Sequence, residues 1–104
     1  MSYAVQLTDT AKADLMEIYR YIAVDLQSAV TAGRQLSRLE KEIASLSEMP
    51  ERFRRYFGKA DGRENLRIMP VDNYSVFYEP SCEENTVTVL RILYGRRDMD
   101  AQKI

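Results

Sequence analysis

Residues 66–98, LRIMPVDNYSVFYEPSCEENTVTVLRILYGRRD, decide the fold of this 104-residue chain. They predict three short strands, because each run is rich in β-branched or aromatic residues. The predicted strands span residues 66–71, 74–79 and 86–94. Tight turns at residues 72–73 and 80–85 join them and favour antiparallel pairing. In the middle strand, alternation puts Val76 and Tyr78 on one face and Ser75 and Phe77 on the other.

Upstream of the strands, residues 3–7 alternate as a strand does, and two helices are predicted after them. Thr8 can cap a helix over residues 9–25, and Ser28 a second one that runs to about residue 48, before Pro50. The apolar face of the first is Leu15, Ile18, Tyr19, Ile22 and Leu26. The seam of the second is Ala29, Ala32, Leu36, Leu39, Ile43 and Leu46. The link of two or three residues predicts an antiparallel hairpin, and the regular seam favours internal packing over an exposed partner groove.

The predicted elements give an α+β fold of the order β-α-α-β-β-β. We expect an antiparallel helical hairpin packed on one face of a small, mainly antiparallel twisted sheet, in one domain over residues 1–104. The other face of the sheet is left open or half open. Residues 99–104 are short and polar, and both a single helical turn and a disordered tail are consistent with them. The strand order stays undetermined.

Composition narrows the chemistry. The chain has no histidine, which removes the commonest zinc ligand and the commonest general base, and it lacks a Gly-rich phosphate loop. We therefore expect no metal and no organic cofactor. Its one cysteine, Cys82, fits a reducing, cytoplasmic compartment and lies in a polar turn. No apolar run is long enough to span a membrane, and the N-terminal stretch does not resemble a signal peptide.

The formal net charge of −1 is unevenly distributed. Residues 51–67 carry six basic and three acidic side chains, while the segments on either side are net acidic. Two interpretations of this linker stay open: a solvated loop, or a patch that binds anions or an acidic partner. Its aromatic residues, Phe53, Tyr56 and Phe57, either fold back as a lid on the core or stack on a ligand. We favour the lid.

Three stretches, in this order, resemble the RelE/ParE superfamily of bacterial type II toxins. They are ADLMEIYRYIA in the first helix, AGRQLSRLEKEIASLSEMP in the second, and the strand block LRIMPVDNYSVFYEP with NTVTVLRILYGRRD. The resemblance covers roughly residues 3–98 and implies the fold derived above. It also implies a toxin that a cognate antitoxin holds inactive, docked on the outer side of the hairpin and on the strand edges, with DNA reached only through the antitoxin.

The superfamily divides by mechanism. RelE-like members cleave mRNA on the ribosome, with basic side chains and a tyrosine or related residues on the open sheet face, whereas ParE-like members inhibit DNA gyrase by binding it. The nuclease pattern carries over to Arg67 in the first hairpin strand and to Arg96 or Arg97 after the last one. Met69 and Ser75 stand where such nucleases often have further basic residues, and MDAQKI holds no tyrosine or histidine. The resemblance therefore favours the ParE-like side.

We expect a toxin that inhibits gyrase by protein binding. The expected target-binding residues are Arg67, Arg91, Arg96 and Arg97. The alternative is a ribosome-dependent mRNA endonuclease, and its expected catalytic residues are Arg67, Tyr94 and Arg96. A third possibility is a non-toxic binding module that keeps the fold.

Structural roles compete with these functional ones. Arg91 can pair with a carboxylate such as Asp98 or Glu79, and Arg67 can do likewise. The tyrosines of the sheet are more typical of half-buried packing than of catalysis.

Overall fold

The computed structural model of the chain describes residues 2–56 and 65–95. Its main elements are β1 (Ala4–Leu7), α1 (Asp9–Arg20), α2 (Ala29–Ala44), β2 (Arg67–Val71), β3 (Tyr74–Ser81) and β4 (Thr86–Tyr94). A π-helical turn over Tyr21–Asp25 continues α1, and 3₁₀ turns over Ser45–Ser47 and Pro50–Arg52 follow α2. The predicted order β-α-α-β-β-β is confirmed.

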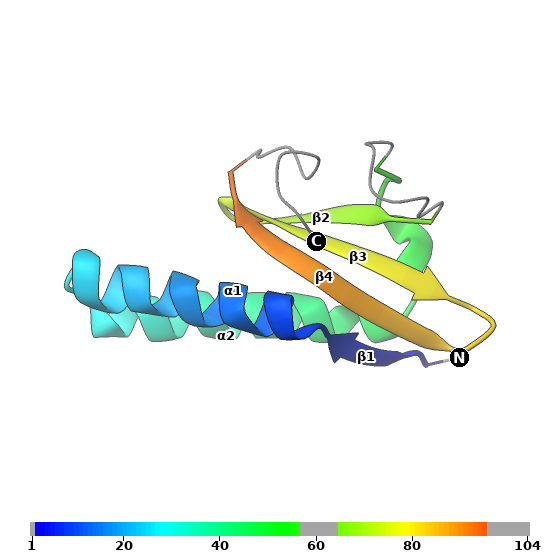
Figure 1. Cartoon of the computed structure of the whole chain (residues 1–104), viewed down its shortest axis with the longest axis horizontal. Coiled ribbons are helices and arrows are strands. Elements are labelled where there is room, and N and C mark those ends of the chain that lie inside the picture. The colour runs from blue at the N-terminus through cyan, green and yellow to red at the C-terminus, as the bar shows by residue number, and fades with distance from the viewer. Residues whose placement is uncertain (1, 57–64, 96–104) are drawn as a thin grey trace.

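The four strands form one sheet in the order β1-β4-β3-β2. The β2–β3 and β3–β4 pairs are antiparallel, while β1 runs parallel to β4 with Ala4 opposite Thr86. The sheet is therefore mainly antiparallel, as expected, and its parallel pair joins the first strand to the last. Figure 1 shows the helical hairpin on one face of this sheet.

Both predicted helix caps are present. The Thr8 hydroxyl accepts the Ala11 N–H at 3.1 Å, and the Ser28 hydroxyl accepts the Thr31 N–H at 3.3 Å. These bonds satisfy main-chain donors that have no partner inside the helix, and they fix where each helix begins. The chain reverses between the helices at Gln27, whose φ of 53° lies in the left-handed region.

The core fills the space between the hairpin and the sheet. Its fully buried members include Ala11 on α1, Leu39 and Ile43 on α2, and Val76 and Tyr78 on β3. Each helix contributes one apolar stripe and each strand one face, which is the layer packing that the periodicity predicts. At one end the Tyr78 hydroxyl donates to the Pro50 carbonyl at 2.6 Å and ties β3 to the turn after α2.

Pro80 differs from the prediction, which placed it in the turn. It belongs to β3 and lies opposite Val87 of β4. Its carbonyl accepts a hydrogen bond from the Asn65 amide at 3.2 Å, on the side of β3 away from β4. At that point β3 has passed the end of its pairing with β2, so a proline without an N–H removes no ladder hydrogen bond.

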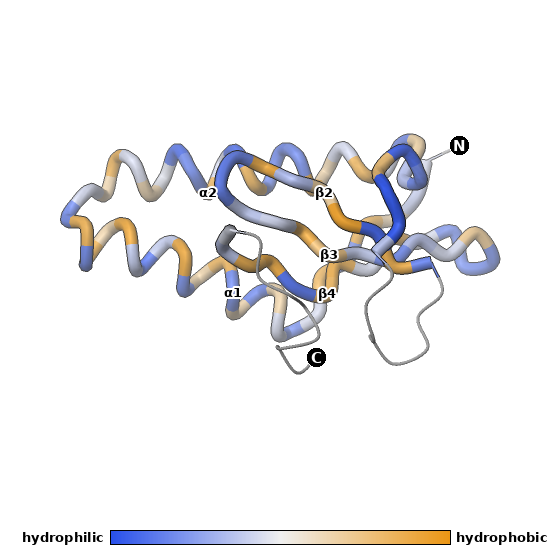
Figure 2. The backbone as a smooth tube through the Cα atoms, turned by 90° about the horizontal axis from the view of Figure 1, so that it is seen from above, coloured by the Kyte–Doolittle hydropathy of each residue, from blue (hydrophilic) through white to orange (hydrophobic). Residues whose placement is uncertain are grey.

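The tip of the hairpin also differs from the prediction. Leu26 was expected on the buried face of the first helix, and Ala29 in the seam of the second, yet Leu26 is 56% exposed and Ala29 is exposed as well. Figures 1 and 2 show the reason: the hairpin extends well beyond the end of the sheet. The π-helical turn also changes the helical repeat there, so the spacing of 3.6 residues no longer applies.

Two aromatic residues at the described start of the linker lie against opposite faces of the sheet. Phe53 packs on the main core, on the helix side of the sheet. On the opposite face, the Tyr56 ring packs edge-on against the Phe77 ring, with 5.2 Å between the ring centroids. The lid prediction is confirmed for these two side chains, while Phe57 lies outside the described residues. In the described part of the chain, no helix is long and apolar enough to cross a membrane.

Candidate functional site

A groove of about 690 Å³ lies where the overhanging hairpin meets the end of the sheet. Its walls come from α1 with its π-helical extension, from α2, from the β2–β3 turn and from the last residues of β4. Its apolar and aromatic lining includes Ile18, Tyr21, Leu26, Tyr74, Ile92 and Tyr94. No sequence pattern indicated this groove, because its walls come from four separate segments.

Three tyrosines contribute to the lining of the groove. Tyr21 and Tyr94 are 51% and 58% exposed, and the Tyr94 ring meets the buried Tyr74 edge-on at 5.6 Å. Burial raises the pKa of the Tyr74 hydroxyl, and the neighbouring Tyr94 and Tyr21 add to the effect. An apolar ring with a polar tip suits protein–protein contact, where tyrosine is enriched.

Arg91, an expected target contact, forms part of the groove lining and is bound by Asp14 of α1. Its Nε and Nη2 donate to the two Asp14 carboxylate oxygens at 2.8 and 3.1 Å, and the Ile92 N–H donates to Asp14 at 2.9 Å. The two charged side chains are only 13% and 15% exposed. The Asp14 carboxylate thus accepts a main-chain N–H of β4 beyond the part of that strand that pairs with β1.

Sequence reasoning missed Asp14, although a signal was present. Asp14 lies among the apolar residues of α1, close to Ala11, Leu15 and Ile18 in the helical repeat. A carboxylate on such a stripe is rarely buried without a partner.

Arg67 lies on the helix side of the sheet. Alternation puts it on the same face of β2 as the buried Met69 and Val71. Its Nη1 donates to the Phe53 and Glu51 carbonyls at 2.8 and 3.1 Å, and its Nε donates to the Asn65 side chain. The side chain is 14% exposed. Arg67 therefore fastens the start of the linker to β2.

Two further positions of the nuclease comparison, Met69 and Ser75, are buried. Met69 is 0% exposed within the main core, and Ser75 is 7% exposed. On the open face, described residues form a small apolar cluster. Its buried members are Leu66, Phe77, Leu90 and Leu93.

The remaining expected site residues are Tyr94, which ends β4, and the two arginines of the segment that follows in the sequence. Tyr94 is exposed at the groove, whereas Arg96 and Arg97 lie outside the described residues. The structure therefore brings Arg91 and Tyr94 to one groove and places Arg67 elsewhere.

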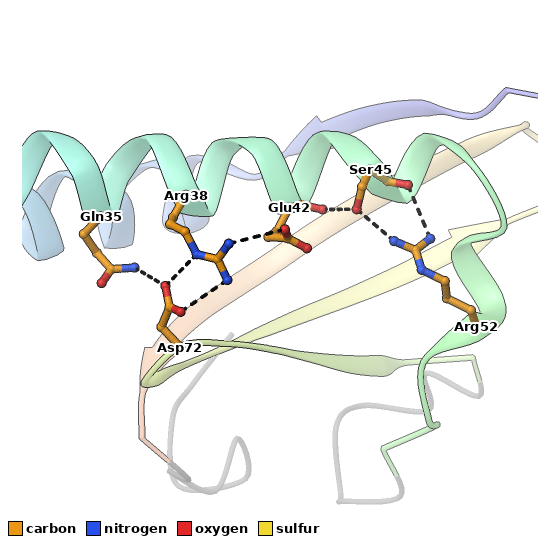
Figure 3. A network of polar contacts seen from close by, with 6 residues as sticks. All are labelled: Gln35, Arg38, Glu42, Ser45, Arg52 and Asp72. Atoms are coloured by element: carbon orange, nitrogen blue, oxygen red, sulfur yellow. Dashed lines mark hydrogen bonds and ion pairs between the residues drawn. The ribbon is translucent and has the colours of Figure 1, made fainter.

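A polar network ties the groove wall to α2 (Figure 3). The Asp72 carboxylate, in the β2–β3 turn, accepts from the Arg38 guanidinium at 3.1 and 3.3 Å and from the Gln35 amide at 3.1 Å. Hydrogen bonds from Arg38 and Gln35 lower the pKa of Asp72. Beyond the end of α2, Arg52 of the Pro50–Arg52 turn donates to the Ser45 hydroxyl at 2.8 Å and to the Glu48 carbonyl. These contacts hold the turn and the helix in a fixed relation.

Solved structures with the same fold include toxins or toxin complexes from three different organisms. In the chromosomal ParDE toxin–antitoxin system of Pseudomonas aeruginosa, the matching chain is 18% identical with a TM-score of 0.72, covering 91% of this chain and 98% of that one. The matching chain of the RelBE2 toxin–antitoxin complex of Mycobacterium tuberculosis is 21% identical, with a TM-score of 0.68, and the match covers 90% of this chain and 99% of that one. The matching chain of the archaeal RelE–RelB complex of Pyrococcus horikoshii is 16% identical, with a TM-score of 0.65, and the match covers 94% of this chain and 100% of that one. At these identities the likeness concerns the fold.

Family membership is decided by sequence. A search of the curated proteins found no match. Residues 5–99 match the family described as the ParE toxin of the type II toxin–antitoxin system parDE. This span includes the hairpin, the four strands except the first residue of β1, and both arginines that follow β4 in the sequence. The chain therefore belongs to the ParE toxin family of type II toxin–antitoxin systems.

Proposed function

We propose that this toxin arrests growth by binding DNA gyrase, and that a cognate antitoxin neutralises it. The main support is structural: the positions at which a ribonuclease relative would present basic side chains have other roles in this chain. Arg67 faces the helix side and donates to main-chain carbonyls, Met69 is part of the core, and Ser75 is a buried hydroxyl. Cleavage of RNA needs charge stabilisation at a pentavalent phosphorane, and these side chains do not supply it.

The same contacts bear on target binding. The expectation that Arg67 and Arg91 touch the target stays a prediction. With 14% and 13% exposure, however, both are largely engaged inside the molecule. We therefore assign the main target contacts to Arg96 and Arg97, whose guanidinium groups suit an acidic protein surface.

The groove and the overhanging hairpin suit the antitoxin. Tyr21, Leu26 and Tyr94 are each more than half exposed around one concave surface, and exposed apolar surface of this kind marks a protein-binding site. An antitoxin segment that folds as it binds would cover these side chains, and the apolar burial would offset its ordering entropy. The expected docking region thus includes the inner wall of the hairpin tip as well as its outer side.

The test is the double variant Arg96→Ala with Arg97→Ala. We expect it to lose inhibition of supercoiling by purified gyrase and to lose growth arrest, while its melting temperature and antitoxin affinity match the wild type. The matched control is Arg34→Ala with Arg54→Ala, which removes two exposed arginines elsewhere and should stay fully toxic. A double variant that unfolds, or one that still inhibits gyrase, contradicts the assignment.

One observation favours the ribonuclease alternative. Tyr94 is exposed at the end of β4, one residue before the segment that carries Arg96, so a tyrosine and an arginine are close in sequence. The alternative predicts mRNA cut on the ribosome in the presence of the purified chain, and loss of cutting in Tyr94→Phe. The gyrase proposal predicts intact mRNA in the same assay.

A further inference from the structure

Gln35 brings a hydrogen-bond acceptor to the groove. It belongs to α2 and is part of the groove lining. Its Nε2 donates to the Asp72 carboxylate at 3.1 Å, and Figure 3 shows the amide nitrogen turned toward Asp72 and the amide oxygen turned away from it. From the residues that the structure describes, the Gln35 Oε1 atom accepts no hydrogen bond. The oxygen is therefore available to a donor on a partner.

The carboxylate of Asp72 decides which end of the Gln35 amide faces it. The nitrogen and oxygen of an amide are similar in size, so its hydrogen-bond neighbours determine its orientation. An ionised carboxylate only accepts hydrogen bonds. Asp72 therefore selects the NH₂ group of Gln35 and leaves the oxygen on the opposite side.

Asp72 is itself held in place. Arg38, on the next turn of α2, donates to both Asp72 carboxylate oxygens at 3.1 and 3.3 Å. The φ of Asp72 is 55°, in the left-handed region that aspartate tolerates better than most residues with a Cβ. On either side of the turn, Val71 and Tyr74 are 2% and 8% exposed. The turn is thus anchored in the core, and its carboxylate gives the Gln35 amide a fixed reference point.

We infer that the Gln35 Oε1 atom is a specificity-determining acceptor for the antitoxin, and that Asp72 is the residue that positions it. An antitoxin segment in the groove would donate a hydrogen bond to this oxygen from an N–H or O–H group. The inference rests on the proposed function, which seats the antitoxin in this groove.

The physical reason is the division of roles inside a mainly apolar groove. Apolar and aromatic side chains supply contact area, but they discriminate poorly between segments of similar hydrophobicity. A polar atom at a fixed position discriminates better, because a partner without a donor removes water from the oxygen and leaves it unpaired. A fixed amide also has less rotational freedom to lose on binding.

The experiment measures the Kd of the purified cognate antitoxin by calorimetric titration, together with thermal melting of the toxin variants. Gln35→Met keeps the side-chain length and the helix propensity but removes the amide oxygen. We expect its Kd to rise roughly tenfold, the effect of about one hydrogen bond. Asp72→Gly keeps the left-handed turn and frees the Gln35 amide to rotate, so its Kd should rise roughly three- to fivefold.

The double variant Gln35→Met with Asp72→Gly tests the positioning role. If Asp72 acts through the Gln35 amide, the double variant should bind the antitoxin no more weakly than Gln35→Met alone. Additive losses would show that Asp72 acts by another route and would overturn its role as the positioning residue. A merely structural role of Asp72 would not produce this dependence on Gln35.

Two control variants remove similar groups elsewhere. Gln6→Met makes the same change on β1, where the Gln6 amide contacts Thr88. Glu42→Ala removes the other carboxylate beside Arg38, at 3.9 Å, and leaves Asp72 in place. Both controls should bind the antitoxin with wild-type affinity. All variants should melt close to wild type, because the Arg38–Asp72 ion pair is exposed to solvent.

Leu26→Ala separates this inference from the proposed docking of the antitoxin. If Leu26→Ala weakens antitoxin binding and Gln35→Met does not, the inference is wrong and the docking region stands. If neither variant weakens binding, the antitoxin does not occupy the groove and both are wrong. Early melting of Gln35→Met would show a structural role and would also overturn the inference. The titration contains no gyrase, so its result is independent of the target.

Discussion

The two halves of the helical hairpin carry similar amphipathic patterns but differ in what covers them. In the proximal half, which lies on the sheet, Ala11, Leu39 and Ile43 are at most 4% exposed. In the distal half, residues 21–30, Leu26 is 56% and Val30 is 71% exposed. Periodicity therefore predicts that a helix has an apolar face, whereas the elements that pack against this face determine how much of it is buried. The distal half keeps apolar surface that a partner can use.

The sharpest test of this comparison is a pair of identical substitutions, one in each half. Leu39→Ala removes a fully buried side chain and should lower the free energy of unfolding by about 4 kcal/mol. Leu26→Ala should change it by at most about 0.5 kcal/mol, because most of that side chain is in water. Urea denaturation of both variants measures the difference.

Leu26→Ala, the variant in the distal half, also tests antitoxin binding. If the antitoxin covers the groove, Leu26→Ala should weaken antitoxin binding roughly tenfold while leaving stability unchanged. Calorimetric titration with the antitoxin measures this change. Equal stability losses in the two variants would contradict the comparison, and unchanged antitoxin affinity would remove Leu26 from the docking surface.

A second pair compares two carboxylates on α1. Asp14→Ala removes the acceptor of three hydrogen bonds in a largely buried ion pair and should cost about 2–3 kcal/mol of unfolding free energy. Glu17→Ala removes an exposed carboxylate whose pKa is lowered by its bond to Arg20. Salt screens such a pair, so its loss should leave stability nearly unchanged. Similar melting temperatures for the two variants would show that the hydrogen bonds of Asp14 to β4 do not stabilise the fold.

The smallest expected effect concerns the Tyr78 hydroxyl, which donates to the Pro50 carbonyl. Burial raises the pKa of Tyr78 from 10.0 to about 12. The unfolded chain loses this proton near pH 10, whereas the folded chain keeps it to about pH 12. The stabilisation is therefore complete below pH 10 and falls as the pH rises between these values.

Tyr78→Phe is the control for this pH dependence. It should cost about 1 kcal/mol at neutral pH, since the hydrogen bond to the Pro50 carbonyl is lost, and it should lose less stability than wild type between pH 10 and 12. Denaturant unfolding at several pH values gives the difference curve. A flat difference would show that the Tyr78 hydroxyl does not titrate abnormally.

Local patterns were enough to predict the elements of the fold. Thr8 and Ser28 mark the helix starts, and the third hairpin strand spans residues 86–94 in both sequence and structure. The parallel pairing of β1 with β4 was not predictable, because the two strands are separated by the rest of the chain. Pro80 was misplaced for a related reason: a proline is tolerated in a strand where no neighbouring strand needs its missing N–H, and the extent of the neighbouring strand is not visible in the sequence.

The site was less accessible to sequence reasoning. Arg67 and Arg91 were correctly recognised as candidates for structural pairing, but the Asp14 partner lies 77 residues from Arg91. The groove likewise depends on where the hairpin overhangs the sheet. Such features are products of tertiary packing, and single-chain periodicity carries no information about them.

The central claim is that this toxin acts on DNA topology rather than on RNA. The most direct test is to induce the chain alone in bacteria and to pulse-label DNA, RNA and protein synthesis during the first minutes. Gyrase inhibition predicts that DNA synthesis falls first and that a DNA-damage response rises. An initial fall in protein synthesis would contradict the claim and favour the ribonuclease, and unchanged synthesis by a folded chain would show a non-toxic binding module.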